Sequence, residues 1–117
     1  GGGTWSLSRV MPRQLATELL MLGDRVGAER LHALGVVNQL CEPGQSLGTA
    51  LNICSKLNLR APNALASIKE LLSSAQQQDL YAHLPQEKQH FVNNLHHPNA
   101  GIGIQAFLNK ETPHYKP

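Results

Sequence analysis

The chain has 117 residues, and ten lysine and arginine residues against eight aspartate and glutamate residues give a net charge of +2 with histidine neutral. That length suits one domain with a core of moderate size. Apolar residues make up 41% of the chain, which excludes a disordered tail, and the small net charge gives no sign of a nucleic-acid partner. No apolar run approaches the roughly 18 residues of a membrane span. We therefore expect neither nucleic acid nor a membrane as a partner.

Glycine and proline divide the first forty residues into short helical patterns. Pro12 suits the first turn of a helix, where its missing N–H costs nothing, and Gly23 suits a helix end. The only β-branched stretch, residues 36–40, predicts a short edge strand or an extended connector. The helices predicted in this half cover residues 4–11, 12–22 and 28–34.

The same periodicity continues after a turn at Glu42-Pro43-Gly44. Four residues are candidate helix N-caps, because their side chains can accept a backbone N–H: Ser46, Asn63, Asp79 and Asn99. Pro85 falls inside the third of these helices, which should kink there or restart with Pro85 in its first turn. Residues 112–117 are expected to be a flexible, unstructured tail.

Strand-like alternation is almost absent, so the predicted fold class is all-α, with at most one short extended segment near residues 36–40. Each predicted helix carries one apolar face and therefore needs a partner. Burying one leucine-sized side chain is worth roughly 1.5–3 kcal/mol, so a few uncovered positions would favour association with another domain or subunit.

Residues that could carry chemistry are few. His83, His90 and His97 are spaced by seven, about 10 Å along a helix, which is too far for two of them to share one metal ion. We interpret them as solvated or boundary histidines and expect no metal site. Cys41 and Cys54 fit reduced thiols in a cytosolic protein, and a single disulfide between them is the alternative.

The glycine-rich stretches do not form nucleotide motifs. Gly1-Gly2-Gly3 and Gly101-Ile102-Gly103 lack the six-residue fingerprints and have no preceding strand. We expect the second stretch to mark close helix packing. The carboxylates are sparse, and nothing in their spacing marks a convergent acid–base set. The residues alone describe a helical module without a catalytic centre.

A succession of short motifs resembles the crotonase family, also called the enoyl-CoA hydratase/isomerase superfamily. They follow the family's order along essentially the whole chain: Gly2-Gly3-Thr4-x-x-Leu7-x-Arg9-Val10, Ala16-x-Glu18-Leu19-x-Met21-Leu22-Gly23, Leu34-Gly35-Val36-Val37-Asn38 and Gly101-Ile102-x-Ile104-x-Ala106-Phe107-Leu108-x-Lys110.

The resemblance implies a place in the family's fold, in which a ββα-spiral core precedes a helical C-terminal region that packs between subunits. Only the C-terminal portion is matched. Residues 1–44 would be the end of the spiral core, residues 45–111 the helical oligomerisation region, and residues 112–117 the tail. The chain starts with Gly1 rather than Met, and we expect it to be a fragment of a longer protein.

The resemblance implies an acyl-CoA substrate and no separate cofactor, because CoA is part of that substrate. The family's two oxyanion-holding N–H groups and its acidic residues precede this chain, so no catalytic residue is carried over. Gly1, Gly2, Gly3 and Trp5 would border the acyl pocket. Phe107 and Lys110 would approach CoA; a core aromatic and a solvated lysine are the respective alternatives.

The sequence thus predicts the C-terminal part of a 2-enoyl-CoA hydratase or isomerase of fatty acid metabolism. Its implied mechanism is an enolate stabilised by two backbone N–H groups. We expect a cytoplasmic homo-oligomer, a trimer or a dimer of trimers, and an inactive 117-residue chain. The alternative is a non-catalytic oligomerisation module or a degenerate family member.

Overall fold

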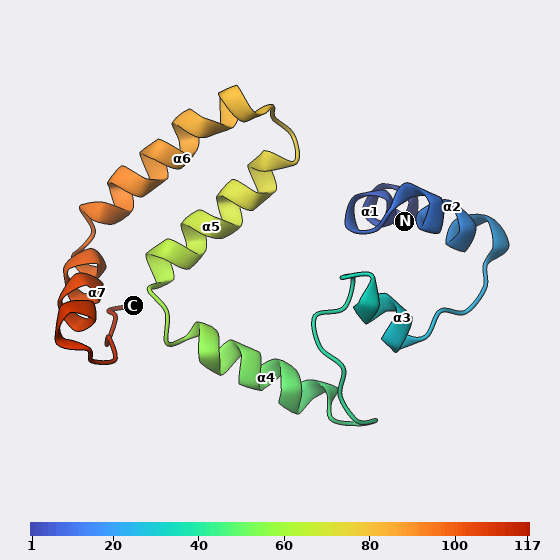
Figure 1. Cartoon of the computed structure of the whole chain (residues 1–117), viewed down its shortest axis with the longest axis horizontal. Coiled ribbons are helices and arrows are strands. Elements are labelled where there is room, and N and C mark those ends of the chain that lie inside the picture. The colour runs from blue at the N-terminus through green and yellow to red at the C-terminus, as the bar shows by residue number, and fades with distance from the viewer. The chain divides into compact units, whose positions relative to one another are not determined.

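The computed structural model describes residues 1–117, which form seven helices and no strand (Figure 1). The predicted all-α fold class is therefore confirmed. The chain divides into two compact units, residues 1–47 and residues 48–117. No helix has the length and apolar content needed to cross a membrane.

The first unit contains α1 (Gly3–Val10), α2 (Arg13–Leu22) and α3 (Ala28–Ala33). Helices α1 and α2 pack together, and Met11 and Ala16 are the buried apolar residues of this unit. Pro12 precedes α2 rather than lying in its first turn. Gly23 ends α2 in the left-handed conformation with φ 69°, and its N–H donates to the carbonyl of Leu19, as a helix-ending glycine should.

Residues 36–40 form no strand, which rules out the edge-strand interpretation of this stretch. Instead the chain folds back on α3. The N–H groups of Val36 and Val37 both donate to the carbonyl of Leu31, and Nδ1 of His32 lies 2.8 Å from the carbonyl oxygen of Val37. A lone β-branched segment has no neighbouring strand here, so its backbone groups pair with the preceding helix.

The second unit is built on α4 (Ser46–Leu57), which begins just before it, and on α5 (Pro62–Ala75), α6 (Leu80–Leu95) and α7 (Pro98–Asn109). Helices α5 and α6 run antiparallel and side by side as a hairpin, and α7 packs against α6 (Figure 1). A turn precedes α4, with the Gln45 N–H donating to the Glu42 carbonyl, as predicted.

Only one of the four predicted N-caps is correct. Asp79 caps α6, its Oδ1 accepting the Ala82 N–H at 2.9 Å. Ser46, Asn63 and Asn99 instead lie inside their helices. For the two asparagines the reason is the preceding proline, which takes the first helical position and moves the cap back to Ala61 and His97.

Pro85 lies inside α6, and the helix runs through it from Leu80 to Leu95 without restarting. The restart interpretation is therefore wrong. Because proline has no N–H, the Tyr81 carbonyl four residues earlier loses its helical partner. Helix α6 nevertheless contacts both α5 and α7.

The apolar core is small. Only Met11, Ala16 and Ala106 are buried apolar residues, whereas large apolar side chains are exposed on six of the helices. The accessible surface is 9589 Å², against about 6,300 Å² for one folded unit of this mass and about 7,500 Å² for two separate units. The chain thus exposes apolar surface that folded domains normally cover.

Residues 112–117 form no helix or strand. They nevertheless return to α7, because the backbone of Lys116 makes two hydrogen bonds with Asn99. Gly103 meets the ring of Tyr115 from this tail, and Gly101 faces open space. The expected close packing at the Gly101-Ile102-Gly103 stretch is therefore with the tail, at Gly103 alone.

Candidate functional site

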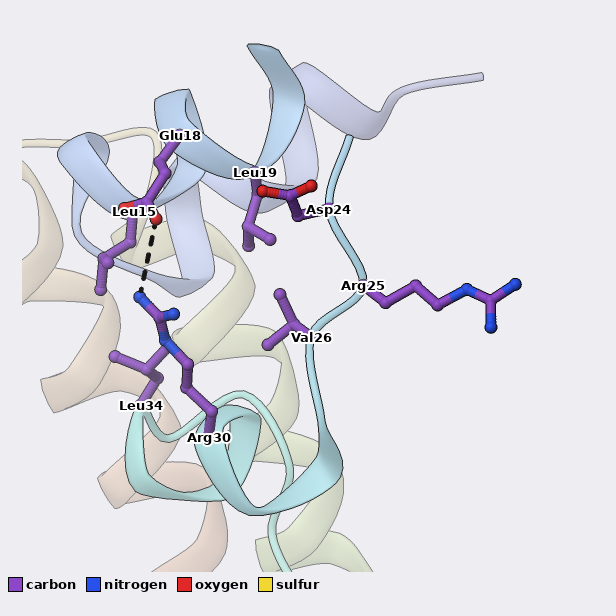
Figure 2. A pocket seen from close by; sticks show the side chains of 8 residues that line it. All are labelled: Leu15, Glu18, Leu19, Asp24, Arg25, Val26, Arg30 and Leu34. Carbon is purple, nitrogen blue, oxygen red and sulfur yellow. Dashed lines mark ion pairs between the residues drawn. The ribbon is translucent and has the colours of Figure 1, made fainter. Parts of the chain in front are cut away.

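The first unit contains a hollow of about 390 Å³ between α2 and α3, shown in Figure 2. Four aliphatic side chains point into it: Leu15, Leu19, Val26 and Leu34. Leu15 and Leu19 come from the apolar stripe of α2, and Leu34 ends α3. The segment between the helices supplies Val26, so both helices and their connection are needed to shape the hollow.

Charged groups lie at the rim of this hollow. Nη2 of Arg30 is 4.0 Å from Oε1 of Glu18, and both side chains are about half exposed, so this ion pair contributes little to stability. Asp24 also lines the hollow, while the side chain of Arg25 extends away from it (Figure 2). The lining holds no hydroxyl, thiol or imidazole. The hollow can therefore accept an apolar group, and carboxylates are the groups in its lining that could do acid–base or nucleophilic chemistry.

The predicted pocket-border residues lie at the start of the same unit. Gly2 caps α1 with φ 82°, a conformation that glycine adopts without strain, and a Cβ atom at Gly1, Gly2 or Gly3 would meet nothing within 4 Å. Trp5 is 58% exposed, and the guanidinium of Arg9 lies 4.0 Å from its ring centroid. This cation–π contact fixes one face of the indole ring. None of these four residues lines the hollow.

Phe107 and Lys110 lie at the C-terminal end of α7 in the second unit. The Phe107 side chain is 83% exposed, so within this chain it is not a core aromatic. Lys110 adopts the left-handed conformation with φ 56°, and its ammonium group makes no ion pair. Both side chains are accessible on the same helix end, which leaves them free to meet a ligand or another protein surface.

Two histidines of α6 face α5, and both cysteines are exposed. His83 and His90 lie between α5 and α6: Nδ1 of His83 is 3.5 Å from Oγ of Ser74, and Nε2 of His90 is 3.9 Å from Oε2 of Glu70. No group of three metal-ligating side chains is found. Cys41 and Cys54 are both free and exposed.

Sequence reasoning missed the hollow between α2 and α3. The leucine stripe of α2 was visible in the sequence, but Glu18 and Arg30 are twelve residues apart on different helices. Their pairing depends on how the chain turns at residues 23–27, which periodicity does not describe. The one available signal was that Glu18 and Arg30 carry opposite charges and lie on either side of a connection bounded by Gly23 and Gly27.

Comparison with known proteins identifies the family. The sequence model of the enoyl-CoA hydratase/isomerase family matches residues 1–117, the whole chain. The chain belongs to the enoyl-CoA hydratase/isomerase family. The resemblance drawn from the glycine turn, the α2 helix end and the α7 motif is thereby confirmed.

Individual relatives agree with this family. The chain is 33% identical over 115 residues to a 2,3-dehydroadipyl-CoA hydratase of Escherichia coli K12, covering 98% of this chain and 45% of that enzyme. It is 28% identical over 119 residues to a carnitinyl-CoA dehydratase of the same strain, covering 98% of this chain and 46% of that protein.

Solved structures show the same helical arrangement. An enoyl-CoA hydratase from Polaromonas sp. JS666 superposes with a TM-score of 0.94 at 56% identity, over 98% of this chain and 45% of that one. Enoyl-CoA hydratase EchA1 from Mycobacterium marinum gives 0.91 at 32% identity, over 97% and 45%. The chain thus spans a little under half the length of the relatives it matches.

Proposed function

We propose that this chain is the helical C-terminal part of a 2-enoyl-CoA hydratase, an enzyme that acts on acyl-CoA thioesters. The observation that carries the proposal is the family match over all 117 residues, together with 56% identity to a solved enoyl-CoA hydratase. The family also includes isomerases. We choose hydration because most of the relatives named above are hydratases.

In the proposed reaction, two backbone N–H groups hold the thioester oxygen and stabilise an enolate, and acidic side chains deliver and remove protons. We place these groups outside the 117 residues. One feature supports this: the Glu18 carboxylate at the hollow of the first unit faces the guanidinium of Arg30 rather than a second acidic side chain. The proposal needs no cofactor, because CoA arrives as part of the substrate.

The proposed contribution of this chain is to binding and assembly. The exposed ring of Phe107 offers an apolar contact and the unpaired ammonium group of Lys110 a positive charge, which suit the adenine and the phosphates of CoA. Gly1 to Gly3 and Trp5 would border the acyl group. We further propose a homo-oligomer, a trimer or a dimer of trimers, in the cytoplasm.

A second candidate is an assembly module without catalysis, and the exposed apolar side chains of α4 to α7 favour it. The two candidates differ in what the chain does inside a complete fold. An assembly-only sequence need not preserve the CoA contacts, whereas a hydratase sequence must support turnover when the remaining half of the fold is supplied.

A chimera tests the proposal. The segment of the Polaromonas hydratase that matches this chain is replaced by the 117 residues, and hydration of crotonyl-CoA is followed by absorbance. We expect turnover from the chimera and none above background from the 117-residue chain alone. A folded chimera without activity contradicts the hydratase proposal and favours the assembly module. Turnover by the chain alone contradicts the placement of the catalytic groups.

Substitutions in the same chimera test the CoA contacts. Phe107→Ala and Lys110→Gln should each raise KM for crotonyl-CoA several-fold, because each removes one contact with the CoA portion. Tyr81→Ala is the matched control, since Tyr81 is equally exposed but lies at the start of α6. If KM moves no more than in the control, the assignment of Phe107 and Lys110 is wrong.

A further inference from the structure

The most completely buried side chain in the molecule is polar. Asn99, in the first turn of α7, is 2% exposed, and its side-chain amide pairs with the backbone of Lys116. Oδ1 of Asn99 accepts the Lys116 N–H at 2.8 Å, and Nδ2 donates to the Lys116 carbonyl at 3.0 Å. This is the two-bond pattern by which neighbouring strands pair, made here by a side chain.

Further amides fix the orientation of Asn99. Its Nδ2 also donates to Oδ1 of Asn63 on α5 at 2.9 Å. Nδ2 of Asn63 in turn donates to Oδ1 of Asn94 on α6 at 2.6 Å, and Nδ2 of Asn94 donates to Oγ of Ser67 at 2.7 Å. Because each oxygen faces a donor, Asn99 cannot rotate its amide without losing bonds on both sides.

A second contact lies one turn further along α7. A Cβ atom at Gly103 would be 3.0 Å from the hydroxyl oxygen of Tyr115 and 3.5 Å from its ring, so glycine leaves the space that the tyrosine occupies. A Cβ at Gly101, on the same helix, would meet nothing within 4 Å. Tyr115 also lines a hollow of about 330 Å³ bounded by α5, α6 and α7.

We infer that residues 115–117 are a C-terminal strap, and that Asn99 and Gly103 form the docking site that holds it. The site recognises a tyrosine by the space at Gly103 and a following residue by its backbone amide. With the strap docked, Asn99 connects α5, α7 and the tail through one set of hydrogen bonds. Release of the strap would remove both hydrogen bonds between Asn99 and Lys116 and would loosen α7 from α5.

Hydrogen exchange in the full chain tests the docking. The N–H of the residue before the last in a chain normally exchanges at the rate of an unstructured peptide, so protection there requires a hydrogen bond. We expect the Lys116 N–H to exchange at least about tenfold more slowly than in a peptide of residues 112–117. Asn99→Ala should abolish this protection, and Asn93→Ala, at an exposed position of α6, should not.

A pair of glycine substitutions decides the result if Asn99→Ala fails to fold. Gly103→Val should release Tyr115 and remove the protection of Lys116 while the amides of α6 stay protected. Gly101→Val makes the same change in the same helix at an open position and should leave Lys116 protected. Equal behaviour of the two valine variants would overturn the inference, as would peptide-like exchange of Lys116 in the unmodified chain.

The site should also bind the strap in trans. A chain ending at His114 should be bound by a synthetic peptide of residues 112–117, with recovery of slow exchange at the side-chain amide of Asn99. A peptide with Tyr115→Ala should bind at least about tenfold more weakly, because the space at Gly103 then stays empty. Equal binding of the two peptides would contradict recognition of the tyrosine.

Discussion

Lys110 is the one residue other than glycine with a positive φ, and it ends α7. The N–H of Glu111 donates to the Ala106 carbonyl at 2.9 Å, which closes the helix end in the usual glycine-type pattern. A side chain at this position strains the backbone. The residue that the proposed function places against CoA therefore has a strained backbone conformation, which a glycine at the same position would not have.

Lys110→Gly should stabilise the chain by about 1 kcal/mol, because glycine adopts the left-handed conformation without a Cβ penalty. Urea unfolding followed by circular dichroism measures the change. Lys110→Gln keeps the strain and should unfold at the same urea concentration as the unmodified chain. A loss of stability in the glycine variant would show that the lysine side chain, rather than the backbone, supports this helix end.

The asparagines show what could be predicted from the sequence at this scale. Three of the candidate caps have side chains suited to capping: Asp79, Asn63 and Asn99. Residue type alone does not show which of them caps a helix. The prolines at 62 and 98 did carry the information, since proline favours the first helical position and the residue after it is then inside the helix. The bonds that Asn63 and Asn99 make instead reach 36 and 17 residues along the chain, beyond any local rule.

Among the elements, the α5–α6 hairpin departs from its amphipathic pattern. Its cross-helix contacts include polar pairs, Ser67 with Asn94 and Glu70 with His90, while Ile68, Leu72 and Phe91 are exposed. The apolar periodicity of the sequence located both helices. It could not show which face meets the neighbouring helix, because that depends on a partner distant in sequence or on a surface outside the chain.

Pro85→Ala should stabilise α6 by about 1–3 kcal/mol, because alanine restores an N–H for the Tyr81 carbonyl and removes the clash of the proline ring. The free energy of unfolding in urea measures this, and the exposed Gln89→Ala in the same helix serves as the comparison. An unchanged or lower stability would mean that α6 is bent at Pro85 in a way that its packing against α5 requires.

At the scale of the whole molecule, apolar surface is in excess. The accessible area exceeds the expectation for folded units by about 2,000 Å² or more, which is comparable to the area buried in a stable protein interface. The sequence indicated this excess, because each helix had one apolar face and no partner could be assigned to it. It could not indicate how much of that surface the chain covers by itself.

The 117-residue chain should therefore associate in solution, since each buried leucine-sized side chain contributes roughly 1.5–3 kcal/mol. Light scattering over a concentration series should give a mass well above 12.8 kDa. Phe91→Glu, which places a charge on an exposed apolar position, should lower that mass, and Gln89→Glu should not. A monodisperse monomer would contradict the expectation that these faces are interfaces.

Attachment of the strap depends on the side-chain amide of Asn99. Deamidation would turn it into a carboxylate that presents two acceptors, so the carbonyl oxygens of Asn63 and Lys116 would each face an oxygen in place of a donor. A sample that has aged in this way would keep almost the same mass and its helices, and would still lose the attachment of its carboxyl terminus.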